Sequence, residues 1–251
     1  MQALGYVASI RAAVADRLDA PASLFEGRLR NWRETLDRAA RIAGGLRALG
    51  IAPGDRIGVL SPNHDDYLAL YLAIPWAGAV LVPLNNRWTE AENRFAIADS
   101  TPRLIFVSAD LAQANAALFA EDGPMLVSLG EPRPGWRTLD ELLAGEPADN
   151  AGRCGDDLLA IFYTGGTTGR SKGVMISHAG LIANCLAMHD FGLFPDYCRT
   201  LILPPLFHMA AAATMTTTML AGGTAVIDRA FDPVRSLDLI ADAQTDRKSV
   251  V

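Results

Sequence analysis

One stretch of the chain gathers residue types that bind phosphate. After an apolar run that ends at Tyr163, nine residues (164–172) consist of glycine, hydroxyl side chains, one arginine and one lysine, and an apolar run resumes at Val174. Glycine lets the backbone take positive φ angles and approach a ligand closely. Exposed N–H groups, hydroxyls and a lysine together suit a polyphosphate. Hairpin loops usually have about two to five residues, so this length and composition predict a phosphate-binding loop rather than an ordinary surface turn.

The spacing within this loop excludes the commoner nucleotide-binding motifs. A Walker A motif requires the pattern G-x-x-x-x-G-K-[ST]. Counting from Gly165 places Arg170 at the second glycine, and counting from Gly166 places Ser171 there. The G-x-G-x-x-G pattern of kinases does not fit either. The spacing therefore disfavours a P-loop NTPase.

Histidines form a second set of candidates. His208 follows Pro-Leu-Phe (205–207), and its neighbours alone predict a hydrogen-bonded residue at a helix N-terminus. We expect His178 to be a structural capping or core residue. The segment His64-Asp65-Asp66 lies in the first turn of an expected helix, where acids favour the helix dipole, and we interpret it as structural. His189-Asp190, at the end of a helix, has the same status.

Around these residues, expected strands and helices alternate. Asn31–Glu34 and Thr89–Glu92 form capping boxes that begin helices, Ser61-Pro62 has the pattern of an N-cap followed by proline, and Glu26-Gly27 indicates a hairpin turn within 24–29. Strands separated by helices are typical of parallel α/β sheets. We therefore predict the α/β class, with layered, parallel-rich sheets flanked by helices. Strands are expected at 56–60, 79–82, 103–107, 125–128, 200–203 and 224–227, and helices at 3–18, 31–49, 61–77, 89–99, 110–120, 138 onward, 179–188, 207–221 and 232–243.

A polar linker rich in glycine and proline, 145–157, suggests a division of the chain. We expect a first α/β subdomain at 1–150, a second at 151–244 that carries the phosphate loop, and an atypical tail at 245–251. The uncharged segment 67–84 approaches the length of a membrane span. Pro75, Gly78 and Pro83 interrupt it, so a helix followed by a buried strand explains it better, and we expect no transmembrane segment.

Composition excludes several classes of protein. Half of the 251 residues are hydrophobic, which is enough for a large core, and the net charge of −6 gives no basic surface for nucleic acid. Cys154, Cys185 and Cys198 lack metal-ligand spacing and fit a reducing compartment, so we expect a cytoplasmic protein. The N-terminal residues 1–20 carry charges and lack a continuous apolar core, which argues against a signal peptide.

The phosphate loop and its surroundings resemble one family. Tyr-Thr-Gly-Gly-Thr-Thr-Gly-Arg-Ser-Lys-Gly-Val (163–174) is similar to the phosphate-loop signature of the adenylate-forming, AMP-binding superfamily, which includes acyl- and aryl-CoA synthetases, peptide-synthetase adenylation domains and luciferases. The segments 46–57, 78–92 and 203–208 resemble further family segments. The resemblance covers about 22–243 and indicates the large N-terminal domain of such an enzyme, in incomplete form.

The resemblance implies a reaction in two steps. A carboxylate attacks the α-phosphate of ATP to give an acyl-adenylate and pyrophosphate, and a thiol such as that of CoA then takes the acyl group. Both ATP and CoA would be substrates, and Mg²⁺ would neutralise the phosphates. The first step requires a highly charged phosphate chain to be neutralised and aligned. The third substrate would be a small-molecule carboxylic acid, and apolar residues near His208 favour a fatty or aromatic type.

The resemblance also implies roles for individual residues. Lys172 would act as a cation on the departing pyrophosphate, and His208 would border the acyl pocket and the forming adenylate. Thr164 or Thr167 would help to hold Mg²⁺, Ser171 could add a hydroxyl, and Arg170 lies where the family varies. The residues expected to wrap the β- and γ-phosphates are Thr164, Gly165, Gly166, Thr167, Thr168 and Gly169.

Some family motifs do not occur in these 251 residues. There is no Tyr-Gly-x-Thr-Glu segment, which the family uses to hold adenine and Mg²⁺, and no recognisable lysine of a small C-terminal domain. We therefore expect this truncated chain to be inactive alone, without ATP–pyrophosphate exchange. The last seven residues depart from the family pattern and are expected not to belong to the natural protein. Two alternatives stay open: a peptide-synthetase type of adenylation domain, and a non-catalytic remnant that at most binds nucleotide phosphates or a partner.

Overall fold

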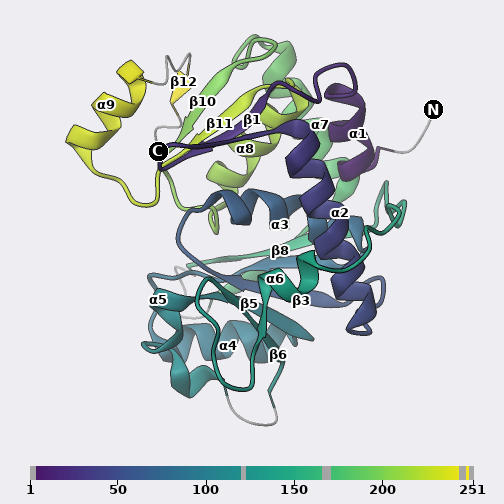
Figure 1. Ribbon diagram of the computed structural model, residues 1–251, viewed down its shortest axis with the longest axis vertical. Coiled ribbons are helices and arrows are strands. Elements are labelled where there is room, and N and C mark those ends of the chain that lie inside the picture. The colour runs from purple at the N-terminus through teal and green to yellow at the C-terminus, as the bar shows by residue number, and fades with distance from the viewer. Residues whose placement is uncertain (1–3, 120–122, 166–170, 243–246, 249–251) are drawn as a thin grey trace.

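The computed structural model describes residues 4–119, 123–165, 171–242 and 247–248, and the strands of these residues form two sheets (Figure 1). The five-stranded sheet has the order β12-β10-β11-β1-β2. Its strands are β1 (Pro21–Phe25), β2 (Arg28–Asn31), β10 (Arg199–Ile202), β11 (Thr224–Ile227) and β12 (Arg247–Lys248). The seven-stranded sheet has the order β7-β6-β5-β3-β4-β8-β9. Its strands are β3 (Arg56–Leu60), β4 (Val80–Pro83), β5 (Leu104–Ser108), β6 (Met125–Leu129), β7 (Arg137–Thr138), β8 (Leu158–Thr164) and β9 (Lys172–Ser177).

Parallel pairing dominates both sheets. Among the described strand pairs, only the hairpins β1–β2 and β8–β9 are antiparallel. The connections between the other neighbours contain helices, except that β6 and β7 are parallel and are joined by residues 130–136 without a helix. The predicted α/β class with parallel-rich sheets is therefore confirmed.

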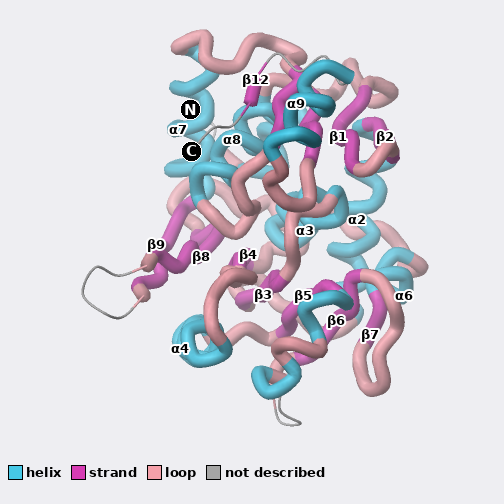
Figure 2. The backbone as a smooth tube through the Cα atoms, turned by 90° about the vertical axis from the view of Figure 1, so that its left-hand side faces the viewer, coloured by secondary structure: helices cyan, strands magenta, loops and turns pink. Residues whose placement is uncertain are grey.

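Helices lie between and outside the sheets (Figures 1 and 2). In Figure 1, α2 and α3 lie between the five-stranded sheet above and the seven-stranded sheet below, α6 packs against α2, and α4 and α5 lie on the lower side. The helix α3 contacts β1 of one sheet and β4 of the other. The helices are α1 (Tyr6–Ala13), α2 (Trp32–Ala48), α3 (Asp65–Trp76), α4 (Glu90–Ser100), α5 (Ala109–Ala112), a 3₁₀ helix η1 (Ala116–Leu118), α6 (Leu139–Leu143), α7 (His178–Asp190), α8 (Met209–Leu220) and α9 (Pro233–Asp242).

The helix α3 forms the centre of the core. Every residue of this helix except Asp66 is buried, because it is covered on all sides, and a helix that is apolar all round is a buried helix. It ends at Trp76 and is followed by β4, so the uncharged segment 67–84 is a helix and then a buried strand, as predicted. No helix among the described residues is long and apolar enough to cross a membrane.

Helix starts were predicted well where the signal is local. Asn31 and Thr89 are N-caps, and each forms the reciprocal capping box with the glutamate three residues later. The start predicted at Ser61-Pro62 was wrong, because α3 begins at Asp65 with His64 as its N-cap. The helix predicted at 110–120 was also wrong, since the described residues of this range, up to 119, form only the short α5 and η1.

The linker 145–157 does not separate the sheets. The strands β8 and β9 follow it but complete the sheet built from β3 to β7, and β1 and β2 precede it but pair into the sheet of β10 and β11. The expected subdomains at 1–150 and 151–244 therefore share both sheets.

Candidate functional site

The predicted phosphate loop connects β8 and β9, which form a hairpin at one edge of the seven-stranded sheet (Figure 2). Its central residues, including the predicted Gly166, Thr167, Thr168 and Gly169, lie outside the described residues. The two ends are described: Thr164 and Lys172 are Cα partners where the hairpin opens. The hairpin therefore holds a hydroxyl and a lysine on facing strands at the mouth of the loop.

These ends are accessible. Thr164, Gly165 and Lys172 are exposed, and Ser171 is half-buried. A Cβ placed on Gly165 would meet no atom within 4 Å. Lys172 makes no ion pair with the residues that the structure describes. An exposed cation beside a hydroxyl and a glycine with open space around it fits a phosphate chain, and the threonine hydroxyl is the hard oxygen donor that Mg²⁺ prefers.

The loop lies at the edge of the sheet where ligands are expected. The strands β8, β4, β3 and β5 are neighbours and run parallel to one another, so their carboxyl ends share one edge. In open α/β sheets, ligands bind outside this edge. The fold therefore places the two described ends of the predicted phosphate loop where an α/β protein normally binds its ligand.

Tyr163 anchors the first arm of the loop. Its hydroxyl donates a hydrogen bond to Asp99 Oδ2 at 2.6 Å, and its ring meets Trp88 edge-on with the centroids 6.5 Å apart. Burial, together with the neighbouring Asp99 carboxylate, raises the pKa of the Tyr163 hydroxyl above its ordinary value. The residue before the loop is thus neutral and tied to α4.

Gly173 makes room for this tyrosine on the facing strand. Tyr163 and Gly173 are Cα partners. A Cβ on Gly173 would lie 2.9 Å from Ile161 Cγ2 and 3.2 Å from the Tyr163 ring, which is closer than carbon atoms normally pack. The second arm of the loop therefore requires glycine directly after Lys172.

His208 lies on a different element. It is the N-cap of α8, in the loop that follows β10 of the five-stranded sheet. Its Nδ1 accepts a hydrogen bond from the Ala210 N–H at 3.2 Å, and the backbone N–H of His208 donates to Pro205 O at 2.9 Å. With Nδ1 used as an acceptor, a neutral ring carries its proton on Nε2, as inferred from this hydrogen bond. The exposed side chain can then donate a hydrogen bond to a substrate oxygen.

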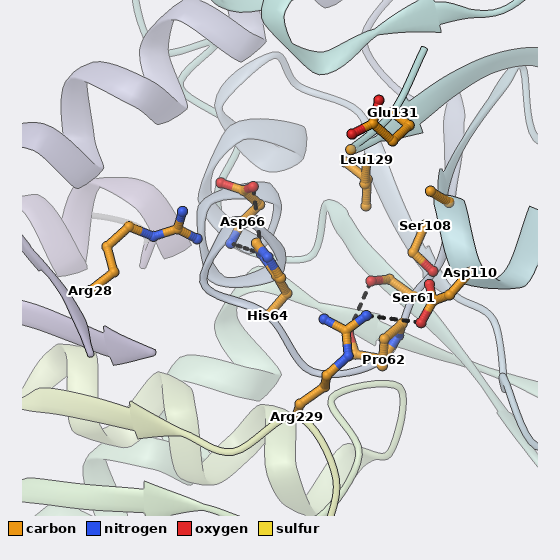
Figure 3. A pocket seen from close by; sticks show the side chains of 12 residues that line it. Arg28, Ser61, Pro62, His64, Asp66, Ser108, Asp110, Leu129, Glu131 and Arg229 are labelled. Atoms are coloured by element: carbon orange, nitrogen blue, oxygen red, sulfur yellow. Dashed lines mark hydrogen bonds and ion pairs between the residues drawn. The ribbon is translucent and has the colours of Figure 1, made fainter. Parts of the chain in front are cut away.

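A cleft of about 440 Å³ opens where residues of the two sheets meet (Figure 3). Ser61 and Ser108 line it from the carboxyl ends of β3 and β5, and Arg229 reaches in from the residues after β11 and pairs with Asp110 at 2.9 Å. Neither Lys172 nor His208 lines it. Within the cleft the charges are largely matched by opposite charges, in contrast to Lys172.

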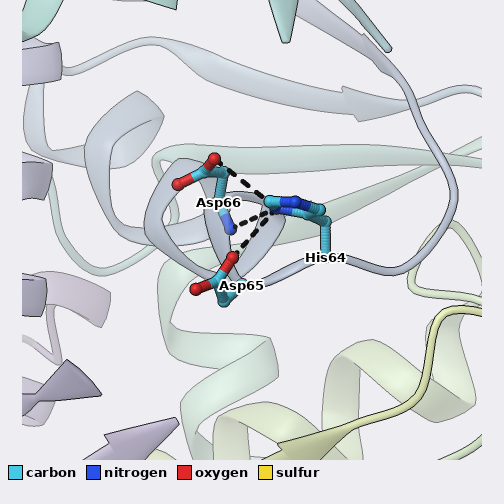
Figure 4. Close-up of side chains that lie close together, drawn as sticks. All are labelled: His64, Asp65 and Asp66. Carbon is cyan, nitrogen blue, oxygen red and sulfur yellow. Dashed lines mark hydrogen bonds and ion pairs between the residues drawn. The ribbon is translucent and has the colours of Figure 1, made fainter. Parts of the chain in front are cut away.

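His64, Asp65 and Asp66 form a cluster at the start of α3 (Figure 4), and arginines bind its two carboxylates. Asp65 receives two hydrogen bonds from Arg28, at 2.6 and 2.8 Å, and lies 2.8 Å from Arg30. Burial alone would raise the pKa of Asp65, but the His64 imidazole and the Arg28 and Arg30 guanidiniums outweigh it and hold the pKa well below its usual range.

Asp66 is bound in the same way, by Arg30 at 3.0 Å and by Arg38 at 2.7 Å. The three residues His64, Asp65 and Asp66 have ligand atoms within 4.8 Å of one another, as a metal site requires. The arginines already neutralise both carboxylates, however, so these contacts support the structural interpretation.

His178 is a core residue. Its side chain is buried at the start of α7, and its Nδ1 accepts a hydrogen bond from the Tyr6 N–H at 3.2 Å. Burial lowers the pKa of His178 to about 4, so the ring is neutral at pH 7. The expectation of a structural histidine is confirmed.

Sequence reasoning missed Asn63 and Asp99. Asn63 is buried and bonds to backbone atoms of the loop before His208. Its sequence signal is a polar residue shortly after a buried strand, which many loops share. Asp99 lies in a helix far from the loop in sequence, and only the fold shows that it contacts Tyr163.

The open parallel edge, the glycine-rich sequence after β8 and the exposed lysine are features of α/β domains that bind ligands at the carboxyl ends of their strands. A family model described as AMP-binding enzyme matches residues 10–246. The chain belongs to the AMP-binding enzyme family.

Curated relatives and solved structures agree with this assignment. A feruloyl-CoA synthase of Amycolatopsis sp. is 40% identical over 205 residues, which are 80% of this chain and 39% of that protein. The long-chain-fatty-acid–CoA ligase FadD13 of Mycobacterium tuberculosis is 33% identical over 246 residues, which are 96% of this chain and 48% of that protein. The chain thus spans less than half the length of these relatives.

Two solved structures show the same fold. The inhibitor-bound N-terminal domain of FACL13 from Mycobacterium tuberculosis has a TM-score of 0.87 at 28% identity, covering 98% of this chain and 62% of that one. ATP-bound MatB from Rhodopseudomonas palustris has a TM-score of 0.81 at 33% identity, covering 94% of this chain and 48% of that one. The predicted resemblance to the adenylate-forming superfamily is confirmed.

Proposed function

We propose that this chain forms the phosphate- and acid-binding part of an AMP-forming acid–thiol ligase. In the first step a carboxylate oxygen of the acid attacks the α-phosphorus of ATP, the bond to the bridging oxygen breaks, and pyrophosphate leaves with its electron pair. In the second step a thiol attacks the acyl-adenylate, and AMP leaves. The observation that carries the proposal is the pairing of exposed Thr164 and Lys172 at the mouth of the glycine loop, in a chain of the AMP-binding family.

The proposed role of Lys172 follows from its position. Charge accumulates on the leaving pyrophosphate during the first step, and a fixed cation at that place stabilises the transition state more than the ground state. The residues proposed to wrap the β- and γ-phosphates with backbone N–H groups and hydroxyls are Thr164, Gly165, Gly166, Thr167, Thr168, Gly169 and Ser171. Thr164 or Thr167 would contribute a ligand to Mg²⁺, which supplies further charge neutralisation when bound.

His208 is proposed to border the acid. Its Nε2 proton is available because Nδ1 caps α8, and a hydrogen bond from Nε2 to the acid or the forming adenylate would orient the attacking oxygen. Buried apolar side chains before it, Leu206 and Phe207, suit a fatty or aromatic acid. The names of the relatives, a feruloyl-CoA synthase and a long-chain-fatty-acid–CoA ligase, agree with this choice.

The acceptor thiol is proposed to be CoA. Feruloyl-CoA synthase and FadD13 are named as CoA-dependent. A fatty acid–[acyl-carrier-protein] ligase of Streptomyces coeruleorubidus is 33% identical over 226 residues, so a carrier-protein thiol is the natural comparison in an assay.

The test is acid-dependent exchange of labelled pyrophosphate into ATP. A polypeptide of the relatives' full length that contains this chain is assayed with a panel of aromatic, fatty and short polar acids, and thioester formation is then followed with CoA or a carrier protein. We expect exchange with an aromatic or fatty acid and transfer to CoA. Exchange with no acid would overturn the proposed activity, and a preference for short polar acids would overturn the proposed substrate class.

A further inference from the structure

The two parts of the proposed site belong to different sheets. The phosphate loop extends from β8 of the seven-stranded sheet, whereas His208 follows β10 of the five-stranded sheet. Groups that act on one substrate must be held within a fraction of an ångström of the productive geometry. Some contact between the sheets must therefore fix the His208 loop, 203–208, relative to the sheet that carries the phosphate loop.

Asn63 makes such a contact. It lies in the loop that joins β3, a strand of the seven-stranded sheet, to α3, and its side chain is buried. Its Nδ2 donates hydrogen bonds to Pro204 O at 3.0 Å and to Asp228 O at 3.1 Å, and its Oδ1 accepts one from the Leu206 N–H at 2.7 Å. This one side chain thus binds the residues that follow two strands of the five-stranded sheet, β10 and β11.

Only an amide side chain of this length satisfies these three backbone groups. The two hydrogens of Nδ2 face two carbonyl oxygens, and Oδ1 faces an N–H group, so the orientation of the amide follows from its partners. Aspartate would present oxygen to both carbonyls, and leucine would leave all three groups without a partner. Buried backbone groups without partners are costly.

A second contact acts on the same loop. The Tyr71 hydroxyl, from α3, donates a hydrogen bond to Leu206 O. Leu206 is therefore held through its N–H by Asn63 and through its carbonyl by Tyr71. The next backbone bond runs from the His208 N–H to Pro205 O, so the constraint on Leu206 extends to the residue that caps α8.

We infer that Asn63 is a positioning residue that fixes the His208 loop to the sheet carrying the phosphate loop, with Tyr71 as its second support. The clamp itself stands on the hydrogen bonds above. Its consequence for acid activation rests on the proposed function. Because its amide is engaged by backbone groups, Asn63 is proposed to act through His208.

The clamp is tested first in the 251-residue chain by amide hydrogen exchange. Asn63→Ala removes three hydrogen bonds and should raise the exchange rates of the His208 and Ala210 amides at least about 10-fold, whereas Tyr71→Phe removes one and should raise them less. Asn93→Ala is the matched control, because Asn93 is an equally buried asparagine that bonds to Asn85 O and does not reach this loop. Unchanged exchange at His208 and Ala210 in both loop variants would overturn the inference, whatever the activity shows.

The consequence is tested by pyrophosphate exchange in the full-length polypeptide. Displacing His208 should lower kcat/KM for the acid about 10- to 100-fold, as expected for misplaced catalytic groups, while KM for MgATP stays within about 2-fold because the phosphate loop is untouched. Equal losses in kcat/KM for the acid and for MgATP would show a general structural role and overturn the proposed positioning role of Asn63. If the unaltered polypeptide shows no exchange with any acid, the proposed function fails, but amide exchange still decides whether the clamp exists.

Discussion

Two groups of polar residues lie at the carboxyl edge of the seven-stranded sheet, and their surroundings are opposite. His64, Asp65 and Asp66 follow β3, and arginines neutralise the Asp65 side chain, which has no exposed surface. Thr164 and Lys172 flank the loop after β8, are exposed, and have no charged partner among the described residues. Charges matched inside the protein stabilise the fold, whereas a charge left unmatched at a ligand-binding edge is available to a substrate.

The largest effect on activity should come from replacing Lys172, which has no charged partner among the described residues. In the full-length polypeptide, Lys172→Met should reduce pyrophosphate exchange about 100-fold, the usual loss when one preorganised charge-stabilising group is removed. The melting temperature should not change, since Lys172 is exposed and makes no ion pair in the described part of the chain.

The matched control for Lys172 is the neighbouring cation. Arg170→Met removes a positive charge from the same loop, at a position for which we propose no role, and should leave exchange nearly unchanged. Equal losses in the two variants would show a general effect of charge and remove the specific role from Lys172.

Replacing Asp65, whose charge is neutralised by arginines, should instead lower the stability of the fold. Asp65→Asn leaves Arg28 and Arg30 without their buried partner, so it should lower the free energy of unfolding by about 3 kcal/mol, measured by urea denaturation. Asp37→Asn, which breaks an exposed pair with Arg41, should cost under about 0.5 kcal/mol. A similar small cost in both variants would contradict the contrast.

The pH dependence of Asp65 has a definite sign. Its pKa is depressed in the folded protein, so its stabilisation is complete above its unfolded pKa of about 3.9 and is lost as the pH falls below that value. Asp65→Asn should therefore flatten the acid limb of a plot of stability against pH.

The hairpin that presents Lys172 depends on glycine at the next position. Gly173→Ala places a methyl group against Ile161 and the Tyr163 ring, so it should cost about 1–2 kcal/mol through overpacking. Gly27→Ala is the comparison in open space, because nothing lies within 4 Å of its Cβ, although its φ of +78° strains alanine. Chemical denaturation should show whether the steric contact at Gly173 costs more than the backbone strain at Gly27.

A smaller effect on stability should come from His178, which is kept neutral by burial and not by a charged partner. Its folded pKa of about 4 lies below the ordinary value of 6.5, so the unfolded chain binds more protons between these values. Stability should be complete above about pH 6.5 and decrease as the pH falls toward 4. His178→Asn, which keeps an acceptor for the Tyr6 N–H, should reduce this slope in thermal melts, and an unchanged slope would contradict the assignment.

Local patterns predicted most of the fold, and tertiary contacts explain the failures. The capping boxes at Asn31 and Thr89 need only residues within one turn, so the sequence alone revealed them. Ser61-Pro62 has an equally good local pattern, but Asn63 is engaged by the opposite sheet, and His64 takes the cap instead. Long-range contacts overrode the local preference there.

The candidate site, like the fold, has features that local sequence predicts and features that only tertiary contacts reveal. The composition and spacing of 164–172 predict a phosphate loop from the sequence alone, because a ligand-binding loop carries its chemistry in consecutive residues. Asp99 and Asn63, which hold Tyr163 and the His208 loop, lie far away in sequence and have ordinary neighbours. Supporting residues of this kind become visible only when the fold brings their partners together.

The pairing of β1 with β11 sets the order in which the chain can fold. Ser23 pairs with Ala225, about 200 residues later, whereas β3 to β9 pair among themselves within 56–177. During synthesis from the N-terminus, the seven-stranded sheet can assemble while β1 still lacks its neighbour. Such distant pairings close late and slow folding. Until β11 is made, the hairpin of β1 and β2 therefore has the β1 edge unpaired as well as the β2 edge, and unpaired strand edges favour aggregation.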